Sequence, residues 1–291
     1  MNVTLPPLHV GQGTTLGALT IFPVWVEDEP LHGLEWRIAA LRVSERAGSP
    51  VVEELVARNR STRPLVALEG DLVTGGWQDR MLAKSVVLEP REARVLDALC
   101  VEHGRWSGEQ AHNVGGRRAA AGIRHHNLAA NRNPNGNAQS EVWNRIARYD
   151  ANLGGSETSA LSAHLDRTSD DAQLLPRPIA GQRGVILGVG GRVLGAELFG
   201  NARGLADRWT GILEAALLDA RLAPTRPTQA ETARGFARWM AAMTLVSGPK
   251  AGAADTLTSS RGHVTATGLA RESIVHLSLL DERHPVLEVV A

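Results

Sequence analysis

Three short apolar runs, each next to a group of charged and glycine residues, most constrain how this chain can fold. The runs are Pro64 to Leu68, Met81 to Leu88 and Arg94 to Val101. Runs of this length between Gly, Pro and Asp clusters are typical of strands joined by tight turns. If successive strands pair as a meander, some of the polar groups meet at one edge of a sheet, and we expect a functional site there. These groups are Glu69-Gly70-Asp71, Gly75-Gly76-Trp77-Gln78-Asp79-Arg80 and Glu102-His103-Gly104-Arg105-Trp106.

The composition excludes several classes of protein. Hydrophobic residues make up 43% of the 291 residues, which is enough for a large core and one or two domains. Lys and Arg number 31, as do Asp and Glu, so we expect neither nucleic acid nor an anionic membrane as a partner. The single Cys100 excludes an internal disulfide and a cysteine-based zinc site, and it favours a cytoplasmic location. An apolar run of about 18 residues, which a membrane span needs, is absent from the sequence.

The first half of the chain reads as mostly strands. Residues 7–26 are rich in β-branched residues, and we assign strands to 35–44 and 51–58 because their neighbours are strands. Residues 107–139 are polar and predict a long loop. A helix should follow from an N-cap at Ser140 to a stop at Gly154-Gly155, because apolar residues recur at helical spacing.

The second half reads as mixed helix and strand. Residues 166–182 form a polar connection, and a hairpin should turn at Gly190-Gly191. Two amphipathic helices are predicted, one after Asn201 and one from about Gln229 to a stop at Gly248-Pro249. Strands at 262–267 and 273–280 should close the chain.

The pattern as a whole predicts an α+β fold. A mostly antiparallel β part, residues 1–168, should precede an α+β part, residues 169–291, in which hairpins pack on two helices. One continuous domain is the alternative to these two parts.

Carboxylates and an Arg-Gln pair are the first candidates for chemistry. Glu69, Asp71 and Asp79 could bind a hard cation or transfer protons, but Glu-Gly-Asp is also an ordinary turn. Gln78 and Arg80 could hold a phosphate or carboxylate between them. The alternative is a buried Arg80 paired with Glu69 or Glu102, which would hold the end of the sheet together.

The segment after the third run offers a second set of candidates. Cys100 and His103 should point to opposite faces of a strand end, which disfavours a thiol nucleophile. His103, Arg105 and Trp106 could instead line a pocket in which Trp stacks on a ring and Arg binds an attached anion. Trp77 and Trp106 could equally fill the core.

The remaining candidates are weaker. His112, His125 and His126 lack the usual spacing of metal ligands, so we predict no metal site. Gly115-Gly116-Arg117-Arg118 resembles an anion-binding nest but lacks the GK[ST] ending of a P-loop. The glycines around Gly190 fail the GxGxxG register, and GxSxG does not occur. The residues identify no cofactor.

Several separated motifs together resemble one family. They resemble the ARG-and-rhodanese-phosphatase-superfamily-associated protein domain, where ARG stands for ADP-ribosylglycohydrolase, and the resemblance runs from about residue 8 to 281. The motifs are Glu69-Gly70, Gly76-x-Gln78-Asp79-Arg80, Cys100-Val101-Glu102-x-Gly104-Arg105-Trp106, Ser140-Glu141-Val142-Trp143, Ser156-x-Thr158, Gly191-Arg192-Val193-x-Gly195-x-x-Leu198-Phe199, Leu205-x-x-x-Trp209 and Leu218-Asp219-Ala220.

The resemblance implies a role in the metabolism of ADP-ribose or other nucleotides derived from NAD. The first hypothesis is an accessory protein that binds a small nucleotide-like ligand through Gln78, Asp79, Arg80, His103, Arg105 and Trp106. The second is an enzyme, of hydrolase or lyase type, that uses Glu69 or Glu102 as general acid or base. The third is a protein-interaction scaffold. A second copy of the chain and an enzyme of ADP-ribose metabolism are the candidate macromolecular partners.

Overall fold

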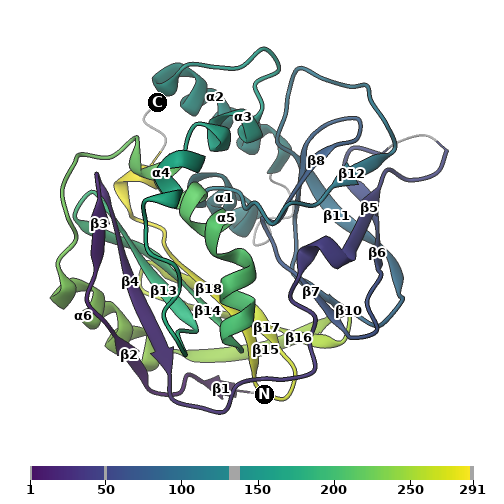
Figure 1. The fold of residues 1–291 in the computed structure, drawn as a ribbon. Coiled ribbons are helices and arrows are strands. Elements are labelled where there is room, and N and C mark those ends of the chain that lie inside the picture. Colours follow the sequence, from purple (N-terminus) through teal and green to yellow (C-terminus); the bar gives the residue numbers. More distant parts are fainter. Residues whose placement is uncertain (1, 49–50, 131–137, 289–291) are drawn as a thin grey trace. The chain divides into compact units, whose positions relative to one another are not determined.

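The computed structural model describes residues 2–48, 51–130 and 138–288, and it has the predicted α+β class with mostly antiparallel sheets (Figure 1). The residues form two compact units. The first contains the chain up to Gly33 together with Leu174–Trp209 and Asp219–Glu288. The second contains Leu34–Gln173 and Thr210–Leu218, so helix α5 (Ala202–Ala220) contributes to both. The predicted division into parts 1–168 and 169–291 stays a prediction.

The first unit is built on a ten-stranded antiparallel sheet. Its path runs β1, β15, β16, β17, β18, β14, β13, β4 and β2, and β3 pairs with β4 off this path. Helix α6 (Ala230–Ala241) packs against β2 and β14 and buries Ala233, Ala237 and Met240 in the apolar core. The strands are β1 (Asn2–Thr4), β2 (Leu8–Val10), β3 (Thr14–Leu16), β4 (Leu19–Val26), β13 (Gly184–Val189), β14 (Arg192–Phe199), β15 (Thr244–Ala251), β16 (Ala254–Arg261), β17 (Val264–Ala270) and β18 (Ile274–Asp281), and the short 3₁₀ helix η2 (Pro285–Leu287) follows them.

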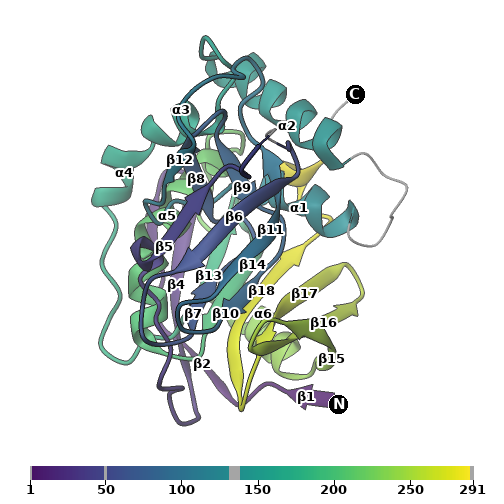
Figure 2. The same cartoon turned by 90° about the vertical axis from the view of Figure 1, so that its right-hand side faces the viewer.

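The second unit contains a closed six-stranded barrel. The strand order is β11, β6, β5, β12, β8 and β9, and β9 returns to β11. Figure 2 shows β5, β6 and β11 side by side. These strands are β5 (Leu41–Ser44), β6 (Glu54–Asn59), β8 (Leu72–Gly75), β9 (Arg80–Leu82), β11 (Ala93–Cys100) and β12 (Ala111–Asn113). Outside the barrel lie the pair β7 (Leu65–Ala67) and β10 (Val86–Leu88), the 3₁₀ helix η1 (Ile38–Ala40), and helices α1 (Ala121–Ala130), α2 (Ala138–Leu153), α3 (Leu161–Asp166) and α4 (Ser169–Gln173).

Most predicted elements are confirmed. The strand assigned to 51–58 is β6, and the predicted hairpin is β13 and β14, with positive φ angles of 60° and 88° at Gly190 and Gly191. Both predicted helices after Asn201 and Gln229 are present. The run Met81 to Leu88 is two strands rather than one, because β9 pairs within the barrel while β10 pairs with β7.

The strand assigned to 35–44 is a strand only in β5 and contains η1, and the polar connection 166–182 contains α4. Three further predictions are wrong for identifiable reasons. The polar loop at 107–139 contains β12, which is too short to show a period, and α1, whose alanines favour helix despite their polar neighbours. Ser140 is not an N-cap, because α2 already begins at Ala138. Gly248-Pro249 does not stop α6 but lies inside β15, where the register shifts between Ser247 and Lys250, and a strand tolerates proline at such a bulge.

Gly268 on β17 offers a test of the packing in the ten-stranded sheet. A Cβ at this position would lie 2.2 Å from the His276 carbonyl oxygen of β18, a backbone atom that cannot move aside cheaply. We expect Gly268→Ala to lower the free energy of unfolding by about 2–3 kcal/mol in a denaturant titration.

Gly262 supplies the matched control in the β16–β17 turn. Its φ is +60° and a Cβ there would meet open space, so Gly262→Ala should cost only the left-handed backbone penalty of about 1 kcal/mol. Equal losses in the two variants would contradict the packing seen between β17 and β18.

Candidate functional site

The β8–β9 turn and the end of β11 come together at one edge of the barrel. The backbone N–H of Asp79 donates to Glu102 Oε2 at 2.9 Å, and Gln78 Nε2 donates to the Glu102 carbonyl at 3.0 Å. Val101 N in turn donates to the Asp79 carbonyl at 2.9 Å. Two of the three polar groups in the sequence therefore meet, because β9 is the barrel neighbour of both β8 and β11.

Arg105 cross-links these two segments. Its Nε and Nη2 donate to the two Glu102 oxygens at 2.9 and 2.6 Å. Nη1 donates to the carbonyls of Gly76 and Ser107 at 2.7 and 3.0 Å, and Nη2 also reaches Asp79 Oδ1 at 3.4 Å. A guanidinium has five N–H donors, and these contacts occupy all of them. Arg105 thus holds the loops in place and has no donor left for a phosphate.

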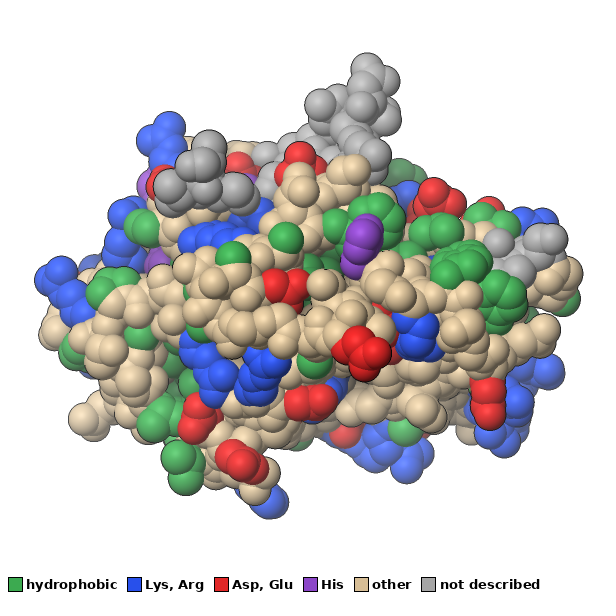
Figure 3. All heavy atoms as spheres, turned by 90° about the horizontal axis from the view of Figure 1, so that it is seen from above, with side chains coloured by type: hydrophobic (Ala, Val, Ile, Leu, Met, Phe, Trp, Pro, Cys, Tyr) green, Lys and Arg blue, Asp and Glu red, His purple; other side chains and the backbone are tan. Residues whose placement is uncertain are grey.

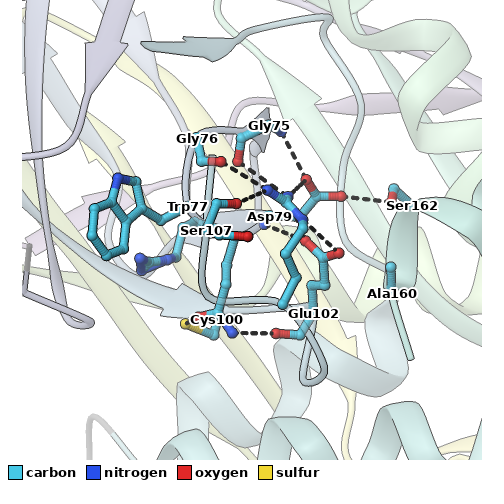
Figure 4. A network of polar contacts seen from close by, with 12 residues as sticks. Gly75, Gly76, Trp77, Asp79, Cys100, Glu102, Ser107, Ala160 and Ser162 are labelled. Carbon is cyan, nitrogen blue, oxygen red and sulfur yellow. Dashed lines mark hydrogen bonds and ion pairs between the residues drawn. The ribbon is translucent and has the colours of Figure 1, made fainter. Parts of the chain in front are cut away.

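The pKa values of the two buried carboxyl groups of this network are shifted in opposite directions. Burial disfavours the charged form of Glu102, but hydrogen bonds from Arg105 and the Asp79 backbone outweigh it and lower the pKa. Burial raises the pKa of Asp79, and the charge of Glu102 adds to the rise, although Ser162 Oγ donates to Asp79 at 2.6 Å. Figure 4 shows Ser162 pointing at Asp79 within the network. Glu102 is therefore a paired carboxylate and a poor proton donor.

Arg80 lies inside the barrel in a buried cluster with Glu45 and His112. The Arg80 side chain has no exposed area, and its Nη1 donates to the Val52 carbonyl at 2.8 Å. Its Nη2 lies 3.4 Å from Glu45 Oε1, which also contacts His112 Nε2 at 3.1 Å. The alternative prediction was a buried Arg80 paired with Glu69 or Glu102. Arg80 is indeed buried, but its partner is Glu45. This position argues against the Arg80 fork as a direct phosphate ligand.

Sequence reasoning missed Glu45, although a signal was present. Leu41, Val43 and Glu45 alternate along β5 and its end, and the first two side chains are buried in the barrel core. The period of two residues places Glu45 on the same inward face. A charged residue at an inward position needs a partner of opposite charge, and Arg80 supplies it.

Glu69 is held by a different arginine. Arg124 Nε of α1 donates to Glu69 Oε2 at 2.8 Å, and both side chains are buried. Asp71 Oδ2 accepts from Leu68 N at 2.8 Å, which confirms the turn interpretation of Glu-Gly-Asp. Glu69 and Glu102 thus each have an arginine partner of their own.

Aromatic rings form the accessible part of the site. Trp106 is 45% exposed, and its ring meets Trp77 edge to face at a centroid distance of 5.4 Å. His103 is exposed and meets Trp143 edge to face at 4.7 Å. The alternative in which Trp106 fills the core is therefore wrong. The rings thus form two pairs, and Trp106 of one pair and His103 of the other are exposed.

Cys100 is a core thiol, as predicted from its apolar surroundings. Burial raises its pKa to about 11, and Sγ donates to Gln78 Oε1 at 2.9 Å. Gln139 of α2 bonds both the N–H and the carbonyl of Cys100, at 2.8 and 2.9 Å. His103 is exposed while Cys100 is buried. A thiol with this pKa is not a nucleophile at neutral pH.

The other sequence candidates have separate positions. His112 belongs to the buried cluster with Glu45, His125 lies on α1, and the His126 side chain lies outside the described part of the chain. Within residues 2–48, 51–125 and 138–288, no three His, Cys, Asp or Glu side chains gather as metal ligands would. Arg117 of the predicted nest is bound by Asp166 and Glu214 at 2.5 and 3.3 Å, so carboxylates already neutralise it.

The surface charge agrees with the neutral composition. Acidic and basic side chains are interspersed in small groups on the face shown in Figure 3. Among the described helices, none is long and apolar enough to cross a bilayer.

Comparison with known proteins identifies the family. Residues 7–280 match the model of the ARG and Rhodanese-Phosphatase-superfamily-associated Protein domain, and the chain therefore belongs to this family. The match confirms the resemblance seen in the sequence and covers nearly the same residues. Neither the curated proteins nor the solved structures contain a significant match to the chain.

Breaking the bidentate pair of Arg105 and Glu102 should destabilise the fold measurably, because it leaves Arg105 without its charged partner. Glu102→Gln removes the charge that Arg105 binds, and we expect the free energy of unfolding to fall by about 2 kcal/mol. Asp97→Asn is the matched control on β11, because the Lys84–Asp97 pair is more than half exposed and such pairs contribute about 0–1 kcal/mol. Similar small losses in both variants would show that Arg105 is not the cross-link described above.

His112 should make stability depend on pH. Burial lowers its pKa, although the neighbouring Glu45 opposes the shift. The unfolded chain binds this proton below about pH 6.5, while the folded chain does not until a lower pH. The contribution of His112 to the free energy of unfolding should therefore have its full value above about pH 6.5. It should decrease as the pH falls below this value.

Variants separate His112 from the other histidines. His112→Gln should flatten part of the decrease between pH 7 and pH 5. The pKa of buried His284 is also lowered by burial, so the remaining slope in His112→Gln should shrink further when His284 is replaced. A profile that His112→Gln does not alter would contradict this assignment.

Proposed function

We propose that this member of the family is an accessory protein that binds a small nucleotide-like ligand related to ADP-ribose. The observation that carries the proposal is the exposed ring of Trp106 beside a network whose charged groups are already paired. A base stacked on an exposed aromatic ring gains about 1–3 kcal/mol and needs no charge from the protein. The description of the family, which associates it with ADP-ribosylglycohydrolases, supports the choice of ligand.

The predicted ligand residues take two roles in this proposal. Trp106 and His103 are exposed and would contact the ligand, the first by stacking and the second through its imidazole. Gln78, Asp79, Arg80 and Arg105 would act indirectly, because their polar groups bond to the protein and fix the two loops that carry the rings. The ligand phosphates would then lie toward solvent, and we expect modest affinity.

Binding is favoured over catalysis by the state of the carboxyl groups. A general acid or base must reach the substrate and exchange its proton near the working pH. Glu102 is bound by Nε and Nη2 of Arg105, and Glu69 is bound by Arg124. The enzyme hypothesis would require one of these pairs to open when the substrate binds.

A protein-interaction scaffold is the second candidate, and the same exposed rings favour it. Trp and Tyr are enriched at the centres of protein interfaces. The partner would be a second copy of the chain or an enzyme of ADP-ribose metabolism. The reduced, buried Cys100 fits our proposal that either role is played in the cytoplasm.

Isothermal titration of the purified chain with ADP-ribose tests the binding proposal. We expect saturable binding that Trp106→Ala weakens at least tenfold, since about 1.4 kcal/mol of lost stacking corresponds to that factor. Trp239→Ala is the matched control, because Trp239 is also a partly buried indole with a guanidinium over it, that of Arg261 at 5.4 Å. If Trp106→Ala bound ADP-ribose as tightly as the unchanged chain, Trp106 would not be the binding surface.

The absence of ADP-ribose binding in this titration would also be informative. If ADP-ribose does not bind the native chain, whose folding can be verified by its thermal transition, the accessory ligand-binding role is wrong. Sedimentation of the chain with and without Trp106→Ala would then test self-association through the same rings.

A further inference from the structure

The environment of Trp106 is asymmetric. The Arg80 guanidinium carbon lies 5.5 Å from the ring centroid and over the ring, while Trp77 contacts Trp106 at an interplanar angle of 75°. Arg80 is entirely buried, and Trp106 is 45% exposed. The part of the indole that reaches solvent is therefore turned away from the guanidinium.

The cation beneath the ring is fixed in place. Arg80 Nη1 bonds the Val52 carbonyl, and Nη2 contacts Glu45. Glu45 is itself held by His112 Nε2 at 3.1 Å and by the backbone N–H of Trp77 at 3.2 Å. Because Trp77 also touches Trp106, the cluster sets the position of both indoles and of the charge below them.

A fixed cation changes what the outer face of an indole prefers. An aromatic face attracts cations because its π-electrons are negative, and a guanidinium on one side uses this attraction. A second positive charge stacked on the opposite side would meet a weakened π-face and the repulsion of Arg80. A neutral, electron-rich ring would keep its full stacking interaction and gain from the polarised indole.

We propose that Arg80 makes Trp106 a selective stacking surface, which accepts a neutral ring such as a purine and rejects a cationic ring such as an N-alkylated pyridinium. Arg80 is thus a specificity-determining residue that acts through Trp106 without touching the ligand. This inference rests on the proposed function and deepens it. Within ADP-ribose-like nucleotides, the protein would bind by the adenine end, and the nicotinamide ring of an oxidised dinucleotide would not occupy the site.

A pair of mononucleotides that differ in ring charge isolates the effect. Nicotinamide mononucleotide carries a cationic ring, and its reduced dihydro form has a neutral ring of the same size on the same ribose phosphate. Isothermal titration of the full chain with each, and with adenosine 5′-monophosphate, should give a Kd for the cationic form at least about tenfold weaker than for the two neutral rings. Trp106→Ala should abolish this ratio, and Trp239→Ala should preserve it.

The outcomes separate this inference from the function on which it rests. Equal affinity for the oxidised and reduced mononucleotides, with loss of both in Trp106→Ala, would overturn the role of Arg80 and keep Trp106 as the binding surface. Absence of binding by all three nucleotides, or binding unchanged in Trp106→Ala, would overturn both. A tenfold preference for the neutral rings that Trp106→Ala loses and Trp239→Ala keeps supports both the role of Arg80 and the proposed function.

Discussion

The guanidinium of Arg105 is the interaction on which the arrangement of the site depends. The β8–β9 turn and the segment after β11 carry the site, and few backbone hydrogen bonds join them, among them Val101 N to the Asp79 carbonyl and Ser107 N to the Trp77 carbonyl. Arg105 joins them by bonding Glu102 at two points and by donating to the carbonyls of Gly76 and Ser107. These carbonyls flank Trp77 and Trp106 in the sequence. The ion pair therefore holds together the two loops that carry the indoles, and the buried cluster of Arg80, Glu45 and His112 lies beneath the Trp106 ring.

The same kind of pair recurs where other arginines of the second unit meet buried carboxylates. Arg105 pairs with Glu102, Arg80 with Glu45 and Arg124 with Glu69. A buried ion pair adds little net stability because desolvation offsets the attraction, but an unpaired buried charge is costly. Each pair thus specifies one arrangement of neighbouring segments more strongly than it stabilises the fold. Charged side chains that the sequence suggests as ligand-binding groups are therefore paired with other side chains of the protein. Uncharged aromatic rings remain exposed.

The sequence predicted the features that depend on local patterns and missed those that depend on partners. The hairpin at Gly190-Gly191 and helix α6 were predictable because turn residues and apolar spacing are local signals. Convergence of Gln78-Asp79 with Glu102 followed from the order of three short strands. The Glu45 partner of Arg80 was not predicted, because the barrel closes through β12, three residues inside a segment that looked like a loop. Similarly, the sequence could not show that every donor of Arg105 is occupied.

Asp79 shows why a perturbed carboxyl group does not by itself indicate catalysis here. Its pKa is raised mainly by burial, which is also how enzymes prepare a general acid. Catalysis additionally needs access, so that the proton can pass to a substrate oxygen within hydrogen-bonding distance. The Asp79 carboxyl is instead enclosed by Ser162, the Gly75 backbone and Arg105. The raised pKa is then a consequence of building the carboxyl into the loop support, and the same burial that produces it keeps a substrate away.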